Sequence, residues 1–337
     1  MPVISVLMAT YNTPYEWLKE SIQSILDQTY SDFEFIIVDD CSTDDMSQIQ
    51  REITDSRVRW VRNAENLGLT KSLNVALGLA TGQYIARMDA DDVSLPERFA
   101  EQVKFMEEHP DVIVCGSYRR AFGIEDKNEI WNIPNTREEQ QVELFFSNCG
   151  LTHPTAMFRK SMLDKFGITY NESYRKAQDY GIWVQCTRFA PMAMIPKVLL
   201  KYRKSDQQIS SVSGKPDQNR YAAMVRADQL TMLGISANEN DKALHESFCR
   251  LEPTFSAEEG ERWVQALLSG NAENRYFDVP LFASRVESQW FHLCKKVYKE
   301  RGDATFKTAY HRAYRLRLDA RDKWLALKGL IARIIRK

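Results

Sequence analysis

The feature that most restricts the fold is a regular alternation of apolar runs and amphipathic segments, which begins at residue 3. Residues 3–8 and 33–38 are short apolar runs typical of buried strands, and residues 15–28 between them have the spacing of an amphipathic helix. The alternation continues as far as residue 116. It predicts βαβ units and a mostly parallel sheet flanked by helices, which is an α/β fold.

Polar clusters follow three of the expected strands, at the points where these strands end. The clusters are Thr10-Tyr11-Asn12, Asp39-Asp40 and Asp89-Ala90-Asp91-Asp92. Because the carboxyl ends of the strands are where ligands bind in such sheets, this edge is the expected place for a site.

The run at residues 89–92 places three carboxylates close together in the chain. Such groups repel one another unless a cation or a set of hydrogen-bond donors compensates. A strand-end turn of this kind suits Mg²⁺ or Mn²⁺, hard ions that bind through carboxylates and substrate phosphates. Capping of the following helix by Asp91, Asp92 and Ser94 explains the same residues equally well.

A glycine-containing turn, Asn66-Leu67-Gly68, leads into another expected helix. Helix N-termini of this kind attract phosphate or ribose oxygens. Lys71 follows in the first turn, where its charge opposes the helix dipole, so an anionic partner would account for its position. A solvated surface lysine is an equally good interpretation of Lys71.

Beyond residue 123 the pattern changes twice. Residues 123–211 are irregular, and helical spacing then dominates to the C-terminus. We expect two domains, an α/β domain over residues 1–212 and an all-helical region over residues 213–337. The chain contains 45 Lys and Arg against 46 Asp and Glu, a balance that argues against binding to nucleic acid. No leader precedes the first strand, which predicts a cytoplasmic location.

The order of the motifs carries more information than any single motif. Residues 4–12, 24–29, 37–44, 66–68 and 88–92 together resemble the family 2 glycosyltransferases, and the likeness extends from residue 3 to about residue 211. The resemblance implies a GT-A fold and an inverting, metal-dependent enzyme. It also implies a nucleotide-diphospho-sugar donor, which we expect to be a UDP-sugar, and Mn²⁺ or Mg²⁺ as cofactor.

The resemblance also assigns roles to single residues. Asp40 matches the uracil-contacting position, Asp91 the metal ligand and Asp89 a contact to ribose or sugar and to the metal site. Asp179, within Gln178-Asp179-Tyr180, matches the catalytic base. His153 matches a position near the donor sugar and the acceptor, although a buried structural histidine is the alternative. The remaining nucleotide-sugar contacts implied are Thr10, Tyr11, Asn12, Asn66, Lys71 and Arg203.

One departure from the family pattern concerns the metal site. Many relatives have a histidine two residues after a Tyr-Arg pair, whereas this chain has Ser205 after Tyr202-Arg203. The resemblance therefore leaves open how the metal site is completed, and it makes Arg203 or Lys204 a candidate contact for the diphosphate.

The chemistry implied is a single displacement. A divalent ion stabilises the charge that develops on the nucleoside diphosphate, while an ionised Asp179 takes the proton of an acceptor hydroxyl. An α-linked donor would then give a β-linked product. A surface or capping carboxylate is the alternative interpretation of Asp179.

The last 27 residues, 311–337, contain nine Lys and Arg and two Asp, a net charge of +7. At helical spacing their apolar and basic residues form two faces. Such a helix either packs on its own protein or lies on an anionic membrane surface, and we favour the membrane. We therefore expect a peripheral enzyme on the inner face of the cell membrane.

The acceptor expected for such an enzyme is a glycan, in particular a lipid-linked glycan used in surface polysaccharide synthesis. Two alternatives remain, a soluble glycosyltransferase acting on a protein or small molecule and a module that binds nucleotide-sugar without transferring it. Oligomerisation through the C-terminal helices is a further expectation that the sequence leaves open.

Overall fold

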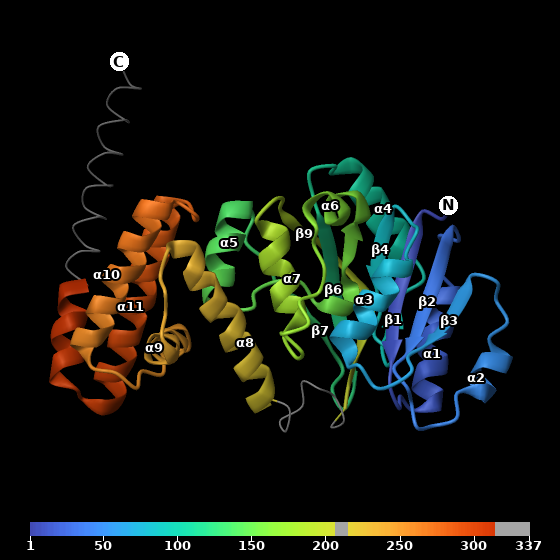
Figure 1. The fold of residues 1–337 in the computed structure, drawn as a ribbon, viewed down its shortest axis with the longest axis horizontal. Coiled ribbons are helices and arrows are strands. Elements are labelled where there is room, and N and C mark those ends of the chain that lie inside the picture. Colours follow the sequence, from blue (N-terminus) through green and yellow to red (C-terminus); the bar gives the residue numbers. More distant parts are fainter. Residues whose placement is uncertain (206–214, 314–337) are drawn as a thin grey trace, which may run out of the picture. The chain divides into compact units, whose positions relative to one another are not determined.

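The computed structural model describes residues 1–205 and 215–313 (Figure 1). The chain divides into two compact units, Met1–Val225 and Arg226–Lys337. This division lies inside helix α8 (Lys215–Gln229), whereas the boundary expected at residues 212/213 lies outside the described residues. The domain limits predicted from the sequence therefore stay a prediction.

The first unit is built on a nine-stranded sheet with the order β3-β2-β1-β4-β8-β6-β9-β5, and β7 pairs with β6. Its first half is parallel, as predicted. There β2 (Phe33–Asp39) and β4 (Tyr84–Arg87) flank β1 (Ile4–Thr10), and β3 (Val58–Arg62) is the edge strand. These parallel strands end at one edge of the sheet, and the polar clusters follow them there.

The second half of the sheet is mixed. Here β8 (Met157–Arg159) runs antiparallel to β4 and to β6 (Val114–Gly123), while β9 (Met192–Lys204) is parallel to β6. The short strands β5 (Val93–Ser94) and β7 (Lys127–Glu129) complete it as antiparallel partners of β9 and β6. The irregular region of the sequence thus contains the longest strand of the sheet.

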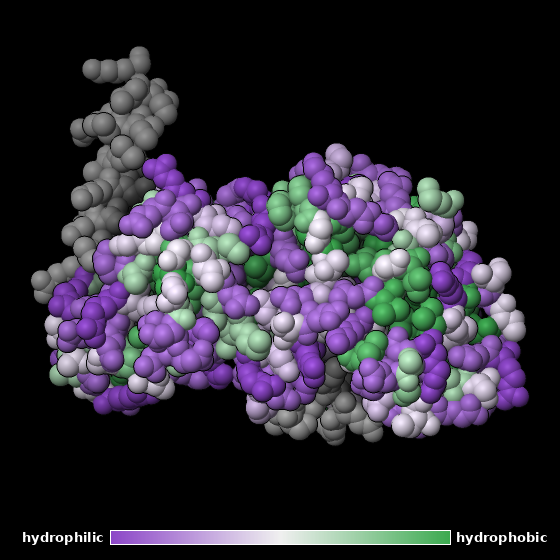
Figure 2. Space-filling view, viewed as in Figure 1, coloured by the Kyte–Doolittle hydropathy of each residue, from purple (hydrophilic) through white to green (hydrophobic). Residues whose placement is uncertain are grey.

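The helices of the first unit cover both faces of the sheet. Alternate residues of β2 point to opposite faces: Phe35 and Ile37 pack with α1 (Tyr15–Leu26) and α4 (Arg98–Glu108), whereas Ile36 and Val38 pack with α3 (Leu69–Leu79). Apolar side chains remain visible over α3 in Figure 2. The other helices of this unit are α2 (Ser47–Glu52), α5 (Arg137–Phe146), η1 (His153–Thr155), α6 (Lys160–Phe166) and α7 (Gln178–Thr187).

The described part of the second unit is helical, as predicted. It contains η2 (Leu230–Leu233), α9 (Glu239–Cys249), α10 (Ala257–Asn274) and α11 (Val279–Arg301). Capping boxes at Asn238 and Ser256 start α9 and α10, and Asp278 caps α11. None of the described helices combines the length and the apolar character that a bilayer crossing requires. The predicted basic amphipathic helix lies outside the described residues from residue 314 onward.

Candidate active site

Two cavities of the first unit lie where the polar clusters meet. The larger, of about 590 Å³, is lined by residues that follow β1, β2 and β4, among them Thr10, Asp40 and Asp89. The smaller, of about 360 Å³, is lined by His153 and Asp179. Four residues line both cavities: Leu69, Asp89, Asp91 and Lys176. The sequence-predicted residues that line the larger cavity are Thr10, Tyr11, Asn12, Asp40, Asn66, Asp89 and Asp91.

Asn12 ties the end of β1 to the loop that follows β2. Its backbone N–H donates to Ser42 Oγ at 3.0 Å, and its Oδ1 accepts from the N–H of Thr43 at 2.8 Å. Asn12 has a φ of 48°, a left-handed conformation that asparagine adopts more readily than most residues. Next to it, Tyr11 keeps about half of its surface exposed, so its ring is available to a planar group in the cavity.

Asp40 is buried and holds the turn that leads into α3. Its Oδ1 accepts from Asn63 Nδ2 at 2.7 Å and from the N–H of Leu67 at 2.8 Å, and its Oδ2 accepts from the N–H of Gly68 at 2.8 Å. Gly68 has a φ of 85°, which favours glycine at this position. Asp40 therefore shapes the wall of the larger cavity as well as lining it.

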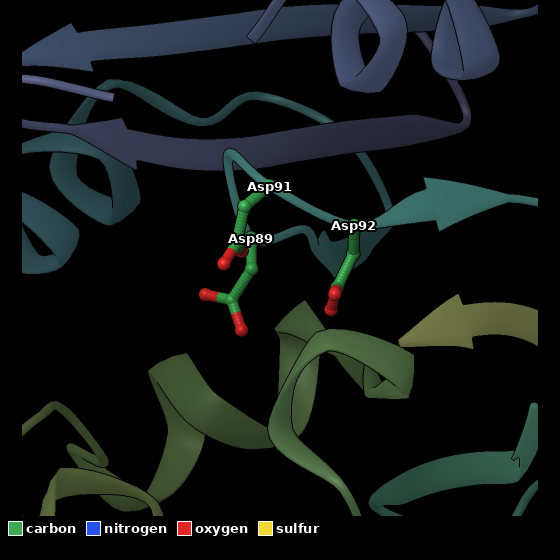
Figure 3. A group of neighbouring side chains, drawn as sticks. All are labelled: Asp89, Asp91 and Asp92. Carbon is green, nitrogen blue, oxygen red and sulfur yellow. The ribbon is translucent and has the colours of Figure 1, made fainter. Parts of the chain in front are cut away.

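The carboxylates of Asp89, Asp91 and Asp92 form a cluster in which one oxygen of each group lies within 4.8 Å of the other two. Figure 3 shows the groups of Asp89 and Asp91 next to each other, with Asp92 further along the turn. Asp89 pairs with the buried guanidinium of Arg87. Burial, together with the charges of Asp89 and Asp91, raises the pKa of Asp92 well above its usual range.

The oxygen atoms that this cluster offers as metal ligands suit a hard divalent cation. Asp92 is fully buried, and its Oδ1 accepts from the N–H of Arg203 at 2.8 Å, whereas its Oδ2 has no hydrogen-bond partner in the described part of the chain. A buried, unsatisfied carboxylate oxygen is costly, and a nearby cation would reduce that cost. Oxygen ligands at a cavity wall are also what Mg²⁺ and Mn²⁺ require.

Arg203 contacts the acidic turn formed by residues 89–92. Its Nε donates to the carbonyl of Asp91 at 2.7 Å, and its guanidinium pairs with Glu20 at 2.5 Å and lies over the rings of Trp17 and Phe122. It lines neither cavity. A diphosphate contact by Arg203 therefore stays a prediction, and its observed contacts hold the residue 89–92 turn in place.

Lys71 and Ser205, two other positions that the sequence singled out, lie in different surroundings. Lys71 also lines neither cavity, and its Nζ lies 3.9 Å from Glu172 Oε2 with nearly half of the side chain exposed. Ser205 lines the larger cavity, and among the described residues its buried Oγ has no hydrogen-bond partner. At this position the hydroxyl, rather than an imidazole, is what the chain offers to a ligand.

Asp179 stands at the start of α7, on the wall of the smaller cavity. Its Oδ2 accepts from Asn148 Nδ2 at 3.1 Å, and its Oδ1 accepts from the N–H of Tyr180 at 2.7 Å. Burial raises the pKa of this carboxyl above its usual value, while the two donors and the backbone counteract part of the rise. A raised pKa brings a carboxylate closer to the basicity that suits a general base at neutral pH.

His153 forms part of the same wall but is engaged in the core. Its Nε2 lies 2.8 Å from the hydroxyl of Tyr170, and its ring makes edge contacts with Tyr170 and Trp183. Burial, and secondarily the charge of Arg87, lower the pKa of His153 well below its usual value, so the ring is neutral. A catalytic role for His153 stays a prediction, and its observed contacts are those of a core residue.

Sequence reasoning missed two residues of the site. Asn148 donates to Asp179, and Lys176 lines both cavities and pairs through its Nζ with Asp217 Oδ2 at 2.7 Å. Asn148 lies two residues after the end of α5 and 31 residues before Asp179, so no local pattern marks it. Lys176 lies three residues before Asp179, just outside the motif that marks Asp179, and its nearness to that motif was the available signal.

Comparison with known proteins identifies the family of the chain. The family model described as glycosyl transferase family 2 matches residues 5–167. An uncharacterized glycosyltransferase of Methanocaldococcus jannaschii is 37% identical over 209 residues, covering 60% of this chain and 71% of the relative. The chain belongs to glycosyltransferase family 2.

Two further proteins are similar to this chain, one in sequence and one in fold. The Escherichia coli enzyme WfaP, named a UDP-Glc:α-D-GlcNAc-diphosphoundecaprenol β-1,3-glucosyltransferase, is 28% identical over 240 residues, covering 71% of this chain and 89% of WfaP. The crystal structure of residues 1–349 of S. aureus TarS in complex with UDP-GlcNAc superposes with a TM-score of 0.57 at 19% identity, covering 93% of this chain and 91% of that TarS fragment. The similarity to TarS confirms the expected GT-A fold.

Proposed function

We propose that this family 2 glycosyltransferase inverts the anomeric carbon of a UDP-sugar while transferring the sugar to a hydroxyl of a lipid-linked glycan. The observation that carries the proposal is the shared wall of the two cavities. Asp89 and Asp91 line both cavities, and the half-buried Asp179 faces the smaller one. Binding groups for a diphosphate and a candidate base thus surround one space.

In this proposal the larger cavity holds the nucleotide. Tyr11 offers a ring face for the base, and the turn held by Asp40 offers polar groups to the base and the ribose. The sugar extends past Asp89 and Asp91 into the smaller cavity. That order places the bond to be broken between the acidic turn and Asp179.

Asp89 and Asp91 would hold Mg²⁺ or Mn²⁺, with Asp92 behind them. The ion would supply Lewis-acid stabilisation of the charge that develops on the departing diphosphate. Arg87 and Arg203 hold the turn rigid, so the carboxylates need little rearrangement when substrate binds. Asp179 takes the acceptor proton on its carboxylate, and Asn148 orients that carboxylate.

The acceptor class is proposed on two grounds. The similar enzyme WfaP carries a lipid-linked acceptor in its name. In addition, the basic and apolar residues of 311–337 would hold the protein against anionic lipid, where such an acceptor is found. A peripheral position on the inner face of the cell membrane follows from the same argument.

A donor and acceptor screen tests the transfer. Purified full-length protein is incubated with Mn²⁺ or Mg²⁺, a panel of UDP-sugars and diphosphoundecaprenol-linked sugars, and release of UDP is measured with and without EDTA. We expect acceptor-dependent release with one donor, an inverted linkage by NMR, and loss of release in EDTA. Nucleotide-sugar binding without release under any combination would instead indicate a non-catalytic binding module.

Vesicle co-sedimentation tests the membrane part separately. The full chain is mixed with vesicles of neutral lipid or with vesicles containing one-third anionic lipid, at low and at high salt. We expect sedimentation only with anionic vesicles and its loss at high salt. A chain that stays in the supernatant with both vesicle types would point to a soluble transferase acting on a protein or small molecule.

A further inference from the structure

Among the described residues that line the proposed donor site, negatively charged side chains outnumber positively charged ones. The larger cavity is lined by the carboxylates of Asp40, Asp89 and Asp91, and Lys176 is the single lysine or arginine among its described lining residues. A nucleoside diphosphate adds further negative charge. A metal ion on Asp89 and Asp91 offsets part of this charge, so another cation is needed next to the phosphates.

The three cations that the sequence singled out are poorly placed for this task. Arg203 contacts the Asp91 carbonyl and Glu20, while Lys71 and Lys204 each pair with a glutamate. None of the three lines the cavities. Arg119 lines the smaller cavity alone and is also paired with a glutamate, which leaves Lys176 as the cation common to both cavities among the described residues.

Lys176 has the required position. It lies just before α7, lines both cavities, and so stands where the diphosphate would join the sugar. Its Nζ is 2.7 Å from Asp217 Oδ2, and the two side chains retain 35% and 53% of their exposure. An ion pair this exposed contributes little to stability, so its lysine can change partners at small cost.

We propose that Lys176 binds the diphosphate of the donor and leaves Asp217 to do so. Phosphate oxygens offer the ammonium group charge-assisted hydrogen bonds that are stronger than an exposed ion pair. As the sugar departs, the same contact stabilises the charge that accumulates on the leaving diphosphate. This inference rests on the proposed function, because it assumes a nucleotide-sugar in the larger cavity.

The partner exchange has a consequence for Asp217. This residue lies in the first turn of α8 and competes with the phosphates for Lys176. Removing its charge should therefore strengthen nucleotide binding. If Lys176 only anchored α8, removing Lys176 or Asp217 would change nucleotide affinity in the same direction. If Lys176 binds the diphosphate, the two substitutions change the affinity in opposite directions.

Calorimetric titration of full-length protein tests the inference. UDP, GDP, CDP and dTDP, each with its parent nucleoside, are titrated in the presence of Mn²⁺ into wild type, Lys176→Met, Lys176→Arg and Asp217→Asn. Lys160→Met is the matched control, since it removes a lysine that lines neither cavity and pairs with Asp164 over the same 2.7 Å. Circular dichroism and thermal unfolding confirm that each variant is folded.

We expect Lys176→Met to weaken binding of the preferred nucleoside diphosphate at least tenfold and to leave binding of the nucleoside unchanged. Lys176→Arg should restore most of the affinity, Asp217→Asn should increase it two- to fivefold, and Lys160→Met should leave it unchanged. Equal affinities of wild type and Lys176→Met, or equal losses in Lys176→Met and Asp217→Asn, would overturn the inference alone. A folded wild type that binds no nucleoside diphosphate would overturn the proposed function, and the inference with it.

Discussion

The two cavities share Asp89 and Asp91 but hold their remaining polar groups in different ways. In the larger cavity, Asn12 and Asp40 are bonded to backbone N–H groups from other segments of the chain, so the wall depends on them. In the smaller cavity, Asp179 accepts one side-chain hydrogen bond, from Asn148, and one from the adjacent N–H. One region is built as a rigid receptor, and the other keeps a carboxylate available for a proton. This difference predicts that mutations in the larger cavity reduce stability and nucleotide affinity, whereas mutation of Asp179 in the smaller cavity reduces turnover.

The largest effect should follow from Asp179→Asn. The amide has nearly the same shape but cannot take a proton, so kcat should fall by about 10²–10⁴-fold. Nucleotide affinity and the free energy of unfolding should change little, because few contacts depend on this carboxylate. UDP release and calorimetry measure the two quantities. Asp111→Asn, an exposed acid outside both cavities, is the control. A large loss of nucleotide affinity in Asp179→Asn would remove the distinction between the cavities.

Asp40→Ala should act in the opposite way. It leaves three donors without their acceptor, on Asn63, Leu67 and Gly68, in a buried position. We expect the free energy of unfolding to fall by about 3 kcal/mol, since each unsatisfied buried donor costs about 1–3 kcal/mol and the loop can relax in part. Nucleotide affinity should fall as well. Urea unfolding followed by tryptophan fluorescence measures the first effect.

The control for this variant is Asp44→Ala, which removes an exposed carboxylate from the same loop. Its stability should stay within about 0.5 kcal/mol of wild type, as for most surface substitutions. If Asp40→Ala were as stable as Asp44→Ala, the larger cavity would not depend on its hydrogen bonds, and the proposed contrast would fail on that side.

A third effect concerns pH. Asp179 must be ionised to accept a proton, and burial raises its pKa above the usual 3.8. Activity should therefore fall with decreasing pH through an acid limb that lies above that value, while nucleotide affinity persists at the same pH. The profile of kcat/KM measures this limb, with binding measured in parallel. An acid limb at or below the usual aspartate range would mean that burial does not tune this carboxylate.

The residues in and around the site also differ in how clearly the sequence marks them. Asp40, Asp89 and Asp91 directly follow apolar strands, so the period-2 pattern and the strand ends suffice to place them. The contact of Arg203 with Asp91 joins residues 112 positions apart, and no local pattern encodes it. Strand β9 was missed because Pro196 and Lys197 interrupt its alternation of apolar and polar residues. At the same place its pairing with β6 shifts register, between Ser117 and Tyr118 of β6.

The smallest effect should come from Asn148→Ala, and it tests the finer balance at Asp179. Asn148 Nδ2 donates to the carboxylate and so favours its ionised form. Without this donor the pKa of Asp179 should rise further, and the acid limb should move to higher pH by less than about one unit, since one neutral donor contributes about 1 kcal/mol. The rate at pH values well above the limb should be nearly that of wild type, because the ionised base is restored there. Asn128→Ala, on the exposed strand β7, should leave the profile unchanged. A rate that is reduced equally at every pH would show instead that Asn148 orients the carboxylate without tuning it, and the smaller cavity would then resemble the larger one in depending on its hydrogen bonds for shape.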